Sequence, residues 1–195
     1  MKRSLFAILF LIIFPALSWA QSQTPPPQIV LTWTDNSTNE EGFNIERASN
    51  CAGPFSPLTS VGFNSVTFVD TSLPDATFFC YRVRAFNAGG TSGFSNTAGA
   101  TTKATLTISK AGTGTVTSAP VGINCGTTCA LLFDANSTVA LTATAGAGFT
   151  FSAWSGACTG AGACNVTMDA AKGVTATFVA LPAPPSAPTN LGVSP

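Results

Sequence analysis

Residues 77–87 (TFFCYRVRAFN) alternate between two kinds of side chain, and this pattern constrains the fold more than any other part of the chain. One face of an extended segment would carry Phe79, Tyr81, Val83 and Ala85, and the opposite face would carry Phe78, Cys80, Arg82 and Arg84. A period of two with aromatic and β-branched residues predicts a β-strand with one face in a core and the other partly in water. The turn at residues 87–90 (NAGG) ends the strand, because consecutive glycines accept the positive φ angles of a hairpin.

The beginning of the chain has the pattern of a secretory signal peptide. Lys2 and Arg3 precede an apolar run over residues 5–14, and small residues lead up to Ala20. These features predict a signal peptide over residues 1–20 that is cleaved after Ala20. The apolar run would rise only about 15 Å as a helix, half of a hydrocarbon core of about 30 Å, so we expect no membrane segment in the mature chain. We therefore predict an extracellular or cell-surface protein, with the periplasm as the alternative compartment.

The chain of 195 residues is poor in charge, since charged residues make up 8% of it and histidine is absent. Without Lys2 and Arg3, the acidic residues outnumber the basic ones, which form no basic stripe. We therefore expect no nucleic-acid partner, because affinity for nucleic acid rests on clustered Lys and Arg. A polar surface with little charge and short apolar strands is typical of secreted all-β modules.

All six cysteines follow the predicted signal peptide, at Cys51, Cys80, Cys125, Cys129, Cys158 and Cys164. An even number of cysteines in an oxidising compartment predicts three disulfides. The length and the Pro-rich punctuation of the chain indicate two domains of about 70 to 80 residues each. Cores of that size are marginal, so cross-links would stabilise them.

The first predicted domain covers residues 28–102 and follows a Pro-rich leader at residues 21–27. Besides the alternating segment, its expected strands are residues 28–33, 42–47, 58–61, 66–69 and 93–98. Short strands separated by turns at these intervals predict a Greek-key β-sandwich.

Five motifs of this domain occur in a fixed order: residues 33–35 (WTD), 42–47 (GFNIER), 68–71 (FVDT), 81–85 (YRVRA) and 93–96 (GFSN). Together they resemble a bacterial fibronectin type III domain over about residues 25–102. The resemblance implies an immunoglobulin-like sandwich in which Trp33 is the core tryptophan of the second strand, under the strand that holds Tyr81. Phe79 stands where the family has a corner tyrosine, so we expect the hydrogen bond of that hydroxyl to be absent and a cross-link to compensate.

A Cys51–Cys80 disulfide fits this resemblance. If Phe79 and Tyr81 face the core, Cys80 faces outward, and Cys51 follows a strand that runs antiparallel beside it in a fibronectin-like sheet. The bridge would close a loop of about 30 residues and stabilise the fold by about 3–4 kcal/mol in the chain-entropy account. A reactive thiol pair is the alternative, which the absence of a nearby lysine or histidine disfavours.

A different pattern begins after a short linker at residues 101–104 and defines a second domain over residues 104–180. Its expected strands alternate Thr with apolar residues and lie at residues 106–108, 112–116, 130–133, 138–143, 149–151, 165–168 and 174–178. Its motifs are residues 112–116 (GTGTV), 124–129 (NCGTTC), 141–143 (LTA), 151–158 (FSAWSGAC), 164–168 (CNVTM) and 174–178 (VTATF). In order and spacing they resemble the divergent internalin-type B-repeat of bacterial surface and secreted proteins. The predicted fold class is therefore all-β, with two small domains in tandem.

The four cysteines of the second domain have spacings that do not suit zinc, which favours C-x2-C pairs and usually histidine. We expect no metal and no cofactor. Local bridges Cys125–Cys129 and Cys158–Cys164 are the preferred pairing, and crossed pairings stay open because spacing does not determine connectivity.

Trp154 is expected in the core of the second domain, because a small sheet needs a large apolar residue at its centre. A sugar-stacking surface is the alternative for this residue. Residues 182–188 (PAPPSAP) predict a stiff polyproline-type spacer. Residues 189–195 (TNLGVSP) resemble the first strand of a further fibronectin type III domain, so we expect this chain to be cut from a longer array.

The residues needed for common catalytic mechanisms are missing from the sequence. Without histidine a Ser-His-Asp triad is impossible, and the paired carboxylates Glu40 and Glu41 would diverge in an extended segment. Oxygen ligands at Asp35, Asn36, Asn39 and Glu40 suit calcium, although solvation of a loop is the preferred interpretation. We predict that the protein is not an enzyme.

The leading hypothesis is a secreted or cell-surface modular protein with an adhesion, binding or spacer role. Its expected partners are extracellular protein or polysaccharide, and the sequence does not predict its oligomeric state. The alternative is an accessory, carbohydrate-binding or linker fragment of an exported hydrolase whose catalytic domain lies outside this chain. A carbohydrate-binding module in its own right would require Trp154 or Trp33 to face solvent.

Overall fold

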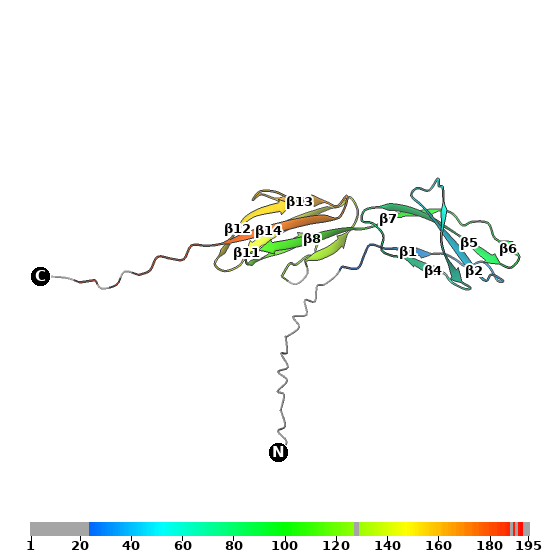
Figure 1. The fold of residues 1–195 in the computed structure, drawn as a ribbon, viewed down its shortest axis with the longest axis horizontal. Helices are drawn as coiled ribbons and strands as arrows, with labels where there is room; N and C mark the ends of the chain where they lie inside the picture. The colour runs from blue at the N-terminus through cyan, green and yellow to red at the C-terminus, as the bar shows by residue number, and fades with distance from the viewer. Residues whose placement is uncertain (1–23, 127–128, 188, 190, 193–195) are drawn as a thin grey trace, which may run out of the picture.

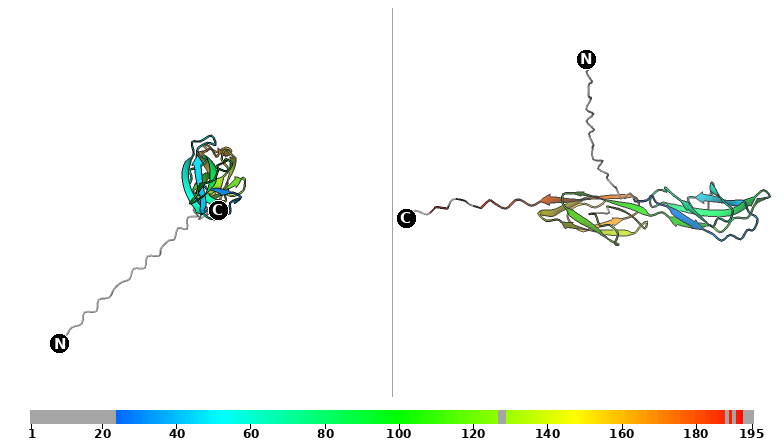
Figure 2. Two further views of the ribbon diagram at one scale, coloured as in Figure 1. Left: turned by 90° about the vertical axis from the view of Figure 1, so that its right-hand side faces the viewer. Right: turned by 90° about the horizontal axis from the view of Figure 1, so that it is seen from below.

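The computed structural model describes residues 24–126, 129–187, 189 and 191–192. The predicted signal peptide at residues 1–20 lies outside the described residues. All regular elements of the described chain are β-strands, which confirms the all-β fold class. The strands form two domains that lie end to end along the long axis of the molecule (Figures 1 and 2). None of the described residues forms a helix of the length and hydrophobicity that a membrane crossing needs.

The first domain is a sandwich of two unequal sheets. Its strands are β1 (Ile29–Thr32), β2 (Gly42–Ala48), β3 (Ser56–Gly62), β4 (Thr67–Asp70), β5 (Phe78–Asn87), β6 (Gly90–Thr91) and β7 (Ala98–Thr101). β1 and β4 make one sheet, while β3, β2, β5 and β6 make the other, with β7 also paired to β5. β5, the alternating segment of the sequence, is the longest strand and contacts strands on both of its edges.

The core of the first domain lies between the two sheets, on the inward face of β5. Tyr81 and Val83 are buried there with Ile45 of β2, as the alternation predicts. The outward face of β5 departs from the prediction at one position, because Cys80 is fully buried rather than partly in water. Its disulfide partner and the neighbouring β7 cover it, and the backbone of Gly99 on β7 lies against the Phe78 ring.

The prediction of a strand at residues 93–98 is wrong, since strand pairing with β5 ends at β6 and begins again only at β7. Ser92 and Ser95 bridge the gap instead. The backbone N–H of Ser95 donates to the Val83 carbonyl at 2.8 Å, while the Val83 N–H donates to the Ser95 hydroxyl at 3.1 Å. Ser92 makes the same pair of contacts with Ala85, at 2.9 and 3.0 Å. Serine hydroxyls therefore accept the hydrogen bonds of β5 that carbonyls of a neighbouring strand would accept.

The second domain packs a four-stranded sheet against a three-stranded sheet. Its strands are β8 (Ala104–Ala111), β9 (Gly114–Ala119), β10 (Ala130–Phe133), β11 (Thr138–Ala145), β12 (Phe149–Gly156), β13 (Cys164–Thr167) and β14 (Lys172–Ala180). The strand orders are β10-β8-β14-β12 and β13-β11-β9. β14 runs parallel to β8, and every other pairing in this domain is antiparallel. The expected strands of this domain are all present, most of them longer than the sequence pattern indicates.

Trp154 fills the core of the second domain. Its side chain is 4% exposed, its ring lies 4.9 Å from that of Phe151, and its indole N–H donates to the Gly162 carbonyl at 3.1 Å. A buried indole whose donor is satisfied stabilises the interior. The sugar-stacking alternative for Trp154 is therefore wrong.

The structure contains three disulfides, with the pairings preferred from the sequence. They are Cys51–Cys80, Cys125–Cys129 and Cys158–Cys164, and the described residues include no free cysteine. The two bridges of the second domain close short local loops. The bridge of the first domain joins the chain just beyond β2 to the middle of the sheet at β5.

Replacing both Cys51 and Cys80 with alanine should lower the free energy of unfolding of the first domain by about 3–4 kcal/mol, because the bridge spans a sequence separation of 29 residues. The matched control replaces Cys125 and Cys129, whose separation is 4, and for which the same relation gives about 2 kcal/mol. Urea unfolding followed by NMR signals from each domain measures both losses. Equal losses for the two pairs would contradict the loop-length explanation.

Candidate binding face

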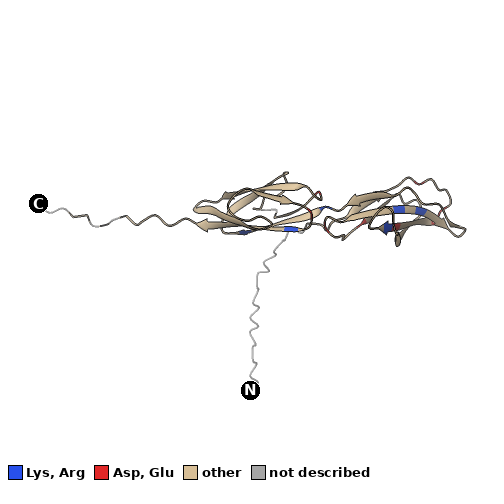
Figure 3. Cartoon of the chain, turned by 90° about the horizontal axis from the view of Figure 1, so that it is seen from above, with Lys and Arg blue, Asp and Glu red and all other residues tan. Residues whose placement is uncertain are grey.

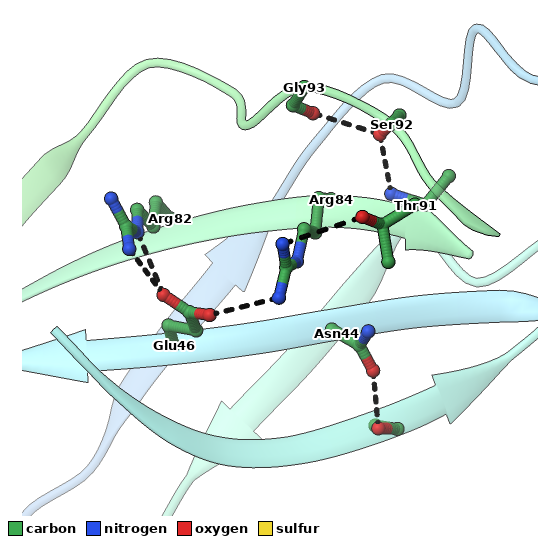
Figure 4. A network of polar contacts seen from close by, with 9 residues as sticks. Asn44, Glu46, Arg82, Arg84, Thr91, Ser92 and Gly93 are labelled. Carbon is green, nitrogen blue, oxygen red and sulfur yellow. Dashed lines mark hydrogen bonds and ion pairs between the residues drawn. The ribbon is translucent and has the colours of Figure 1, made fainter.

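A buried carboxylate organises the outward face of the larger sheet in the first domain. Glu46 of β2 lies directly opposite Arg82 of β5 and accepts hydrogen bonds from its Nη2 at 2.6 Å and its Nε at 2.9 Å (Figure 4). Arg84 reaches the other carboxylate oxygen at 3.5 Å. The glutamate side chain is 9% exposed, whereas the side chains of Arg82 and Arg84 are 28% and 30% exposed. One carboxylate thus holds two cations at the surface in a fixed orientation.

Two phenylalanine rings stack on these arginines. The Phe94 ring centroid lies 3.7 Å from the Arg82 guanidinium carbon and 4.5 Å from that of Arg84, and Phe55 lies 4.4 Å from Arg82 on another side. Cation–π contacts of this kind stabilise by about 0.5–1 kcal/mol each at exposed sites. We call Glu46, Phe55, Arg82, Arg84 and Phe94 the arginine–phenylalanine face.

Phe94 reaches this face because the chain around it does not form a strand. Ser92 and Ser95 hold both sides of the segment to β5 through their hydroxyls, so the two residues between them are displaced outward. Figure 4 shows Ser92 and Gly93 above Arg84. The sequence gives only a weak signal for this arrangement, a serine at each end of a glycine–phenylalanine pair.

A cleft of about 390 Å³ lies at one edge of the arginine–phenylalanine face. Its lining includes Trp33, Arg84 and Phe94. The indole N–H of Trp33 and the Nε of Arg84 are buried and have no hydrogen-bond partner among the described residues. Unpaired buried donors are unusual in folded proteins. A ligand that offers hydrogen-bond acceptors beside an aromatic ring would suit these donors chemically.

On the inward face, Tyr81 takes part in a contact that the sequence analysis did not find. Its hydroxyl donates to Asp70 at the end of β4 at 2.9 Å, and Arg47 of β2 donates to the same carboxylate oxygen at 2.7 Å. Arg47 also lies 4.8 Å from the Phe79 ring centroid. Phe79 has no hydroxyl for the corner hydrogen bond of the family, and the hydroxyl of Tyr81 ties the two sheets together at another position. Burial of its ring, followed by the hydrogen bond and the charge of Asp70, raises the pKa of Tyr81.

The acidic loop before β2 uses its side-chain oxygens to accept backbone hydrogen bonds, one from within the loop and one from the turn between β3 and β4. Asp35 accepts a hydrogen bond from the Ser37 N–H at 2.9 Å, and Glu40 accepts one from the Asn64 N–H at 3.2 Å. Backbone hydrogen bonds lower the pKa of Glu40. Among the described residues, no group of three or more Asp, Glu, Cys or His side chains is placed to hold a metal ion. The hydrogen bonds of Asp35 and Glu40 agree with the preferred interpretation, in which the oxygens of this segment solvate and fix a loop.

Comparison with known proteins bears on the second domain. Residues 104–182 match the family described as the divergent InlB B-repeat domain, so the resemblance found in the sequence is confirmed there. No curated protein matches the sequence. Among solved structures, the chain is similar to the crystal structure of chicken CNTN1 FN1-FN3 domains, with a TM-score of 0.37 and 13% identity over 88% of this chain and 68% of that chain. That score is too low to support an argument, and the fibronectin type III assignment stays a prediction.

The titration of Tyr81 tests its contact with Asp70. The chain has one tyrosine, so the ultraviolet absorbance of phenolate reports this group alone. A raised pKa means that the folded state holds the hydroxyl proton more tightly than the unfolded state, whose tyrosine titrates near about pH 10. The stabilisation is therefore complete below about pH 10 and is lost as the pH rises further. We expect phenolate to appear at higher pH in the native chain than in urea.

The matched control for this titration is Tyr81→Phe, which keeps the ring and removes the proton. Its stability should be lower than that of the parent at neutral pH and should fall less steeply above about pH 10. A native titration that coincides with the titration in urea would show that the hydroxyl is not held by Asp70.

Glu46→Gln should destabilise the first domain by about 1.5–3 kcal/mol, because it weakens charge-assisted hydrogen bonds to two arginines. The control is Asp169→Asn, which removes an exposed ion pair to Lys172 and should cause no measurable loss. Urea denaturation of both variants gives the comparison. Equal stability of Glu46→Gln and the parent would mean that the arginines are held by their phenylalanines alone.

Proposed function

We propose that this chain is a non-catalytic exported protein whose two β-domains form a stiff rod that spaces or presents binding surfaces outside the cell. Modular β-domains, a match to the B-repeat family and three intramolecular disulfides support export, because such bridges persist in oxidising compartments. The signal-peptide pattern of residues 1–20 supports the same compartment. The main support for a stiff rod comes from the contacts at the junction between the domains.

The junction replaces the linker expected at residues 101–104 with buried structure. Thr102 is 1% exposed, and its hydroxyl donates to the Pro74 carbonyl at 2.6 Å and accepts from the Thr77 N–H at 2.8 Å. The Thr102 N–H in turn donates to the Thr77 carbonyl at 2.9 Å. These contacts extend the first domain up to the residue before the second domain begins, so little free chain separates the two.

A loop of the first domain also contacts the second domain directly. The Asp75 carboxylate accepts a hydrogen bond from the backbone N–H of Thr105 in β8. Ala76 packs against the core of the second domain, and its N–H donates to the Lys103 carbonyl at 3.3 Å. Ala76 has a φ of 47°, a conformation that non-glycine residues seldom adopt without support from their surroundings. Contacts on both sides of the connection oppose bending and twisting.

The small number and the distribution of charged residues support a spacer role rather than a role in binding nucleic acid. Figure 3 shows that lysine, arginine and acidic residues are few and scattered along the strands and loops of both domains. The described residues hold their arginines in contacts with acidic or aromatic side chains. Such an arrangement leaves few free cations to neutralise phosphates.

The arginine–phenylalanine face supports a binding role for the distal part of the rod. Its cleft combines exposed aromatic surface with two unpaired donors, at Trp33 and Arg84. Extracellular proteins and polysaccharides both offer the carbonyl or hydroxyl acceptors that such donors need. The spacer role and this binding role are compatible, because a stiff junction fixes where the face is presented.

Asp75→Ala should make the junction flexible, because it removes the side chain that binds the backbone of β8. Spin labels carried by unnatural amino acids at Phe63 and Val121, which are 69% and 95% exposed, allow the distance between the domains to be measured by electron resonance. The parent should give a narrow distance distribution, and Asp75→Ala should give a broad one.

Asp134→Ala is the matched control for this experiment. This variant removes an ion pair to Lys103 beside the same junction. The pair is exposed, with 79% for the Asp134 side chain and 55% for that of Lys103, so the distance distribution should stay narrow. A broad distribution in the parent would contradict the stiff rod. An unchanged narrow distribution in Asp75→Ala would show that the carboxylate does not fix the junction.

A further inference from the structure

The edge of β1 that faces away from β4 has no neighbouring strand among the described residues. The Trp33 N–H donates to the Val66 carbonyl at 3.0 Å, which sets the alternation of the ladder. Leu31 and Ile29, two and four residues earlier, therefore direct their backbone groups toward β4. Val30 and Thr32 direct theirs to the open edge. Exposed edges with unpaired N–H and C=O groups are sites where further strands add.

A second open edge lies across a groove from β1. β7 pairs only with β5 within the described chain, and all four of its residues are exposed. The groove between β1 and β7 has a volume of about 690 Å³, and Tyr81 and Val83 contribute to its lining. The residues that β7 contributes are small, namely Ala98, Gly99 and Ala100. The sandwich thus has space for one more extended segment beside its two-stranded sheet.

The chain immediately before β1 does not supply this segment. Residues 25–27 are three consecutive prolines, which have no backbone N–H to donate to a ladder. The Pro27 carbonyl already accepts the Leu73 N–H at 3.0 Å, which directs this part of the chain toward the junction. An added strand would have to come from elsewhere in this chain or from another chain.

The segment after β14 has the properties of such a strand. Its described part extends away from the second domain at the end remote from the first domain (Figure 1). In the sequence of residues 189–194 (TNLGVS), Thr189, Leu191 and Val193 alternate with Asn190, Gly192 and Ser194, so an added strand would carry the first three on one face. Leu191 is 97% exposed. We propose that residues 189–194 of a second copy of this chain occupy the groove as a strand antiparallel to β1.

The segment of the same copy is too short to take this place. β8 begins at the junction and β14 runs parallel to it, so β14 ends at the far end of the second domain. To return to the junction, the segment would have to run back along the length of β14, which is about 30 Å at 3.3 Å per residue. To pair antiparallel with β1 it would then have to begin at the outer end of that strand, a further ~13 Å away. The spacer at residues 182–188 spans only about 22 Å.

A neighbouring copy placed end to end can supply the segment, because its tail is close enough to the groove and enters it in the antiparallel direction. β1 starts near the junction and runs toward the outer end of the first domain, because Pro27 contacts Leu73 next to the junction loop. A strand that enters from the outer end therefore runs antiparallel to β1. The contact joins the tail of one copy to the first domain of the next, so it is heterologous and produces open chains of molecules rather than closed dimers.

The added strand makes two kinds of contact. Its backbone pairs with the free N–H and C=O groups of Val30 and Thr32, as in other cases of strand addition. Its apolar face, with Leu191 at the centre, covers the rings and methyl groups at the floor of the groove near Tyr81 and Val83. Neither the segment nor β1 and β7 carries a charged side chain, and Arg82, which also lines the groove, is already paired with Glu46, so burial leaves no charge unpaired.

The test compares the chain with a variant that ends at Leu181. This variant keeps every strand and the contact from the Leu181 N–H to the Gly148 carbonyl at 2.8 Å. Analytical ultracentrifugation should show concentration-dependent oligomers of the full chain and monomers of the shortened one. A synthetic peptide of residues 186–195 should bind the shortened chain and slow hydrogen exchange at the Val30 and Thr32 amides, while the Leu31 amide should change little.

Leu191→Asp provides the matched control in both the chain and the peptide. The full chain with this change should be monomeric, and the peptide should bind about tenfold to a hundredfold more weakly because a buried leucine is lost. A monomeric parent with no peptide binding would overturn the proposal. So would oligomers that persist without residues 182–195, or slow exchange at Val30 in a monomer, which would place the segment in the groove of its own copy.

Discussion

The backbone hydrogen bonds of β5 join most of the first domain. One edge of β5 pairs with β2, and the other edge is divided among β6, two serine hydroxyls and β7. Because Ser92 and Ser95 replace strand contacts, Phe94 is free to stack on the arginines outside. On the inside, Tyr81 of the same strand reaches Asp70 in the other sheet. A single strand thus fixes the arginine–phenylalanine face and connects the two layers of the sandwich.

Two largely buried carboxylates, one in each sheet, help to fix the strand arrangement of the first domain in a chain that has few charges. Glu46 pairs with arginines on the outward face, and Asp70 pairs with Arg47 and Tyr81. Removing such carboxylates from water is costly, so they add little stability beyond that of a well-packed apolar pair. They do exclude alternatives, because a slip of one residue would turn Arg82 into the core and the aromatic residues outward. Their contribution is to specificity more than to stability.

The sequence predicted features that depend on neighbouring residues, and it missed those that depend on distant ones. Strand β5 follows from local alternation, and the two short disulfides are the local pairings that were preferred while crossed pairings stayed open. The error at residues 93–98 arose because serine hydroxyls substitute for a strand without changing the alternating pattern. The sequence predicts a linker at Thr102 because the hydrogen-bond partners of this residue, Thr77 and Pro74, lie 25 and 28 residues earlier in the chain. The groove lies beside an edge of β1 that has no neighbouring strand within the described chain, and no local residue pattern predicts an open edge.

An open groove removes part of the apolar burial that a domain of this size needs, and the Cys51–Cys80 bridge offsets that loss. The bridge attaches the chain beyond β2 to β5, directly beside β7, so on the outer face it fixes the strand that forms the floor of the groove. Restricting the unfolded chain in this way stabilises the fold without filling the groove. The second domain has a larger core of buried residues, and its bridges close only short loops. The long-range disulfide therefore occurs in the domain whose sandwich is incomplete, where cross-linking contributes most.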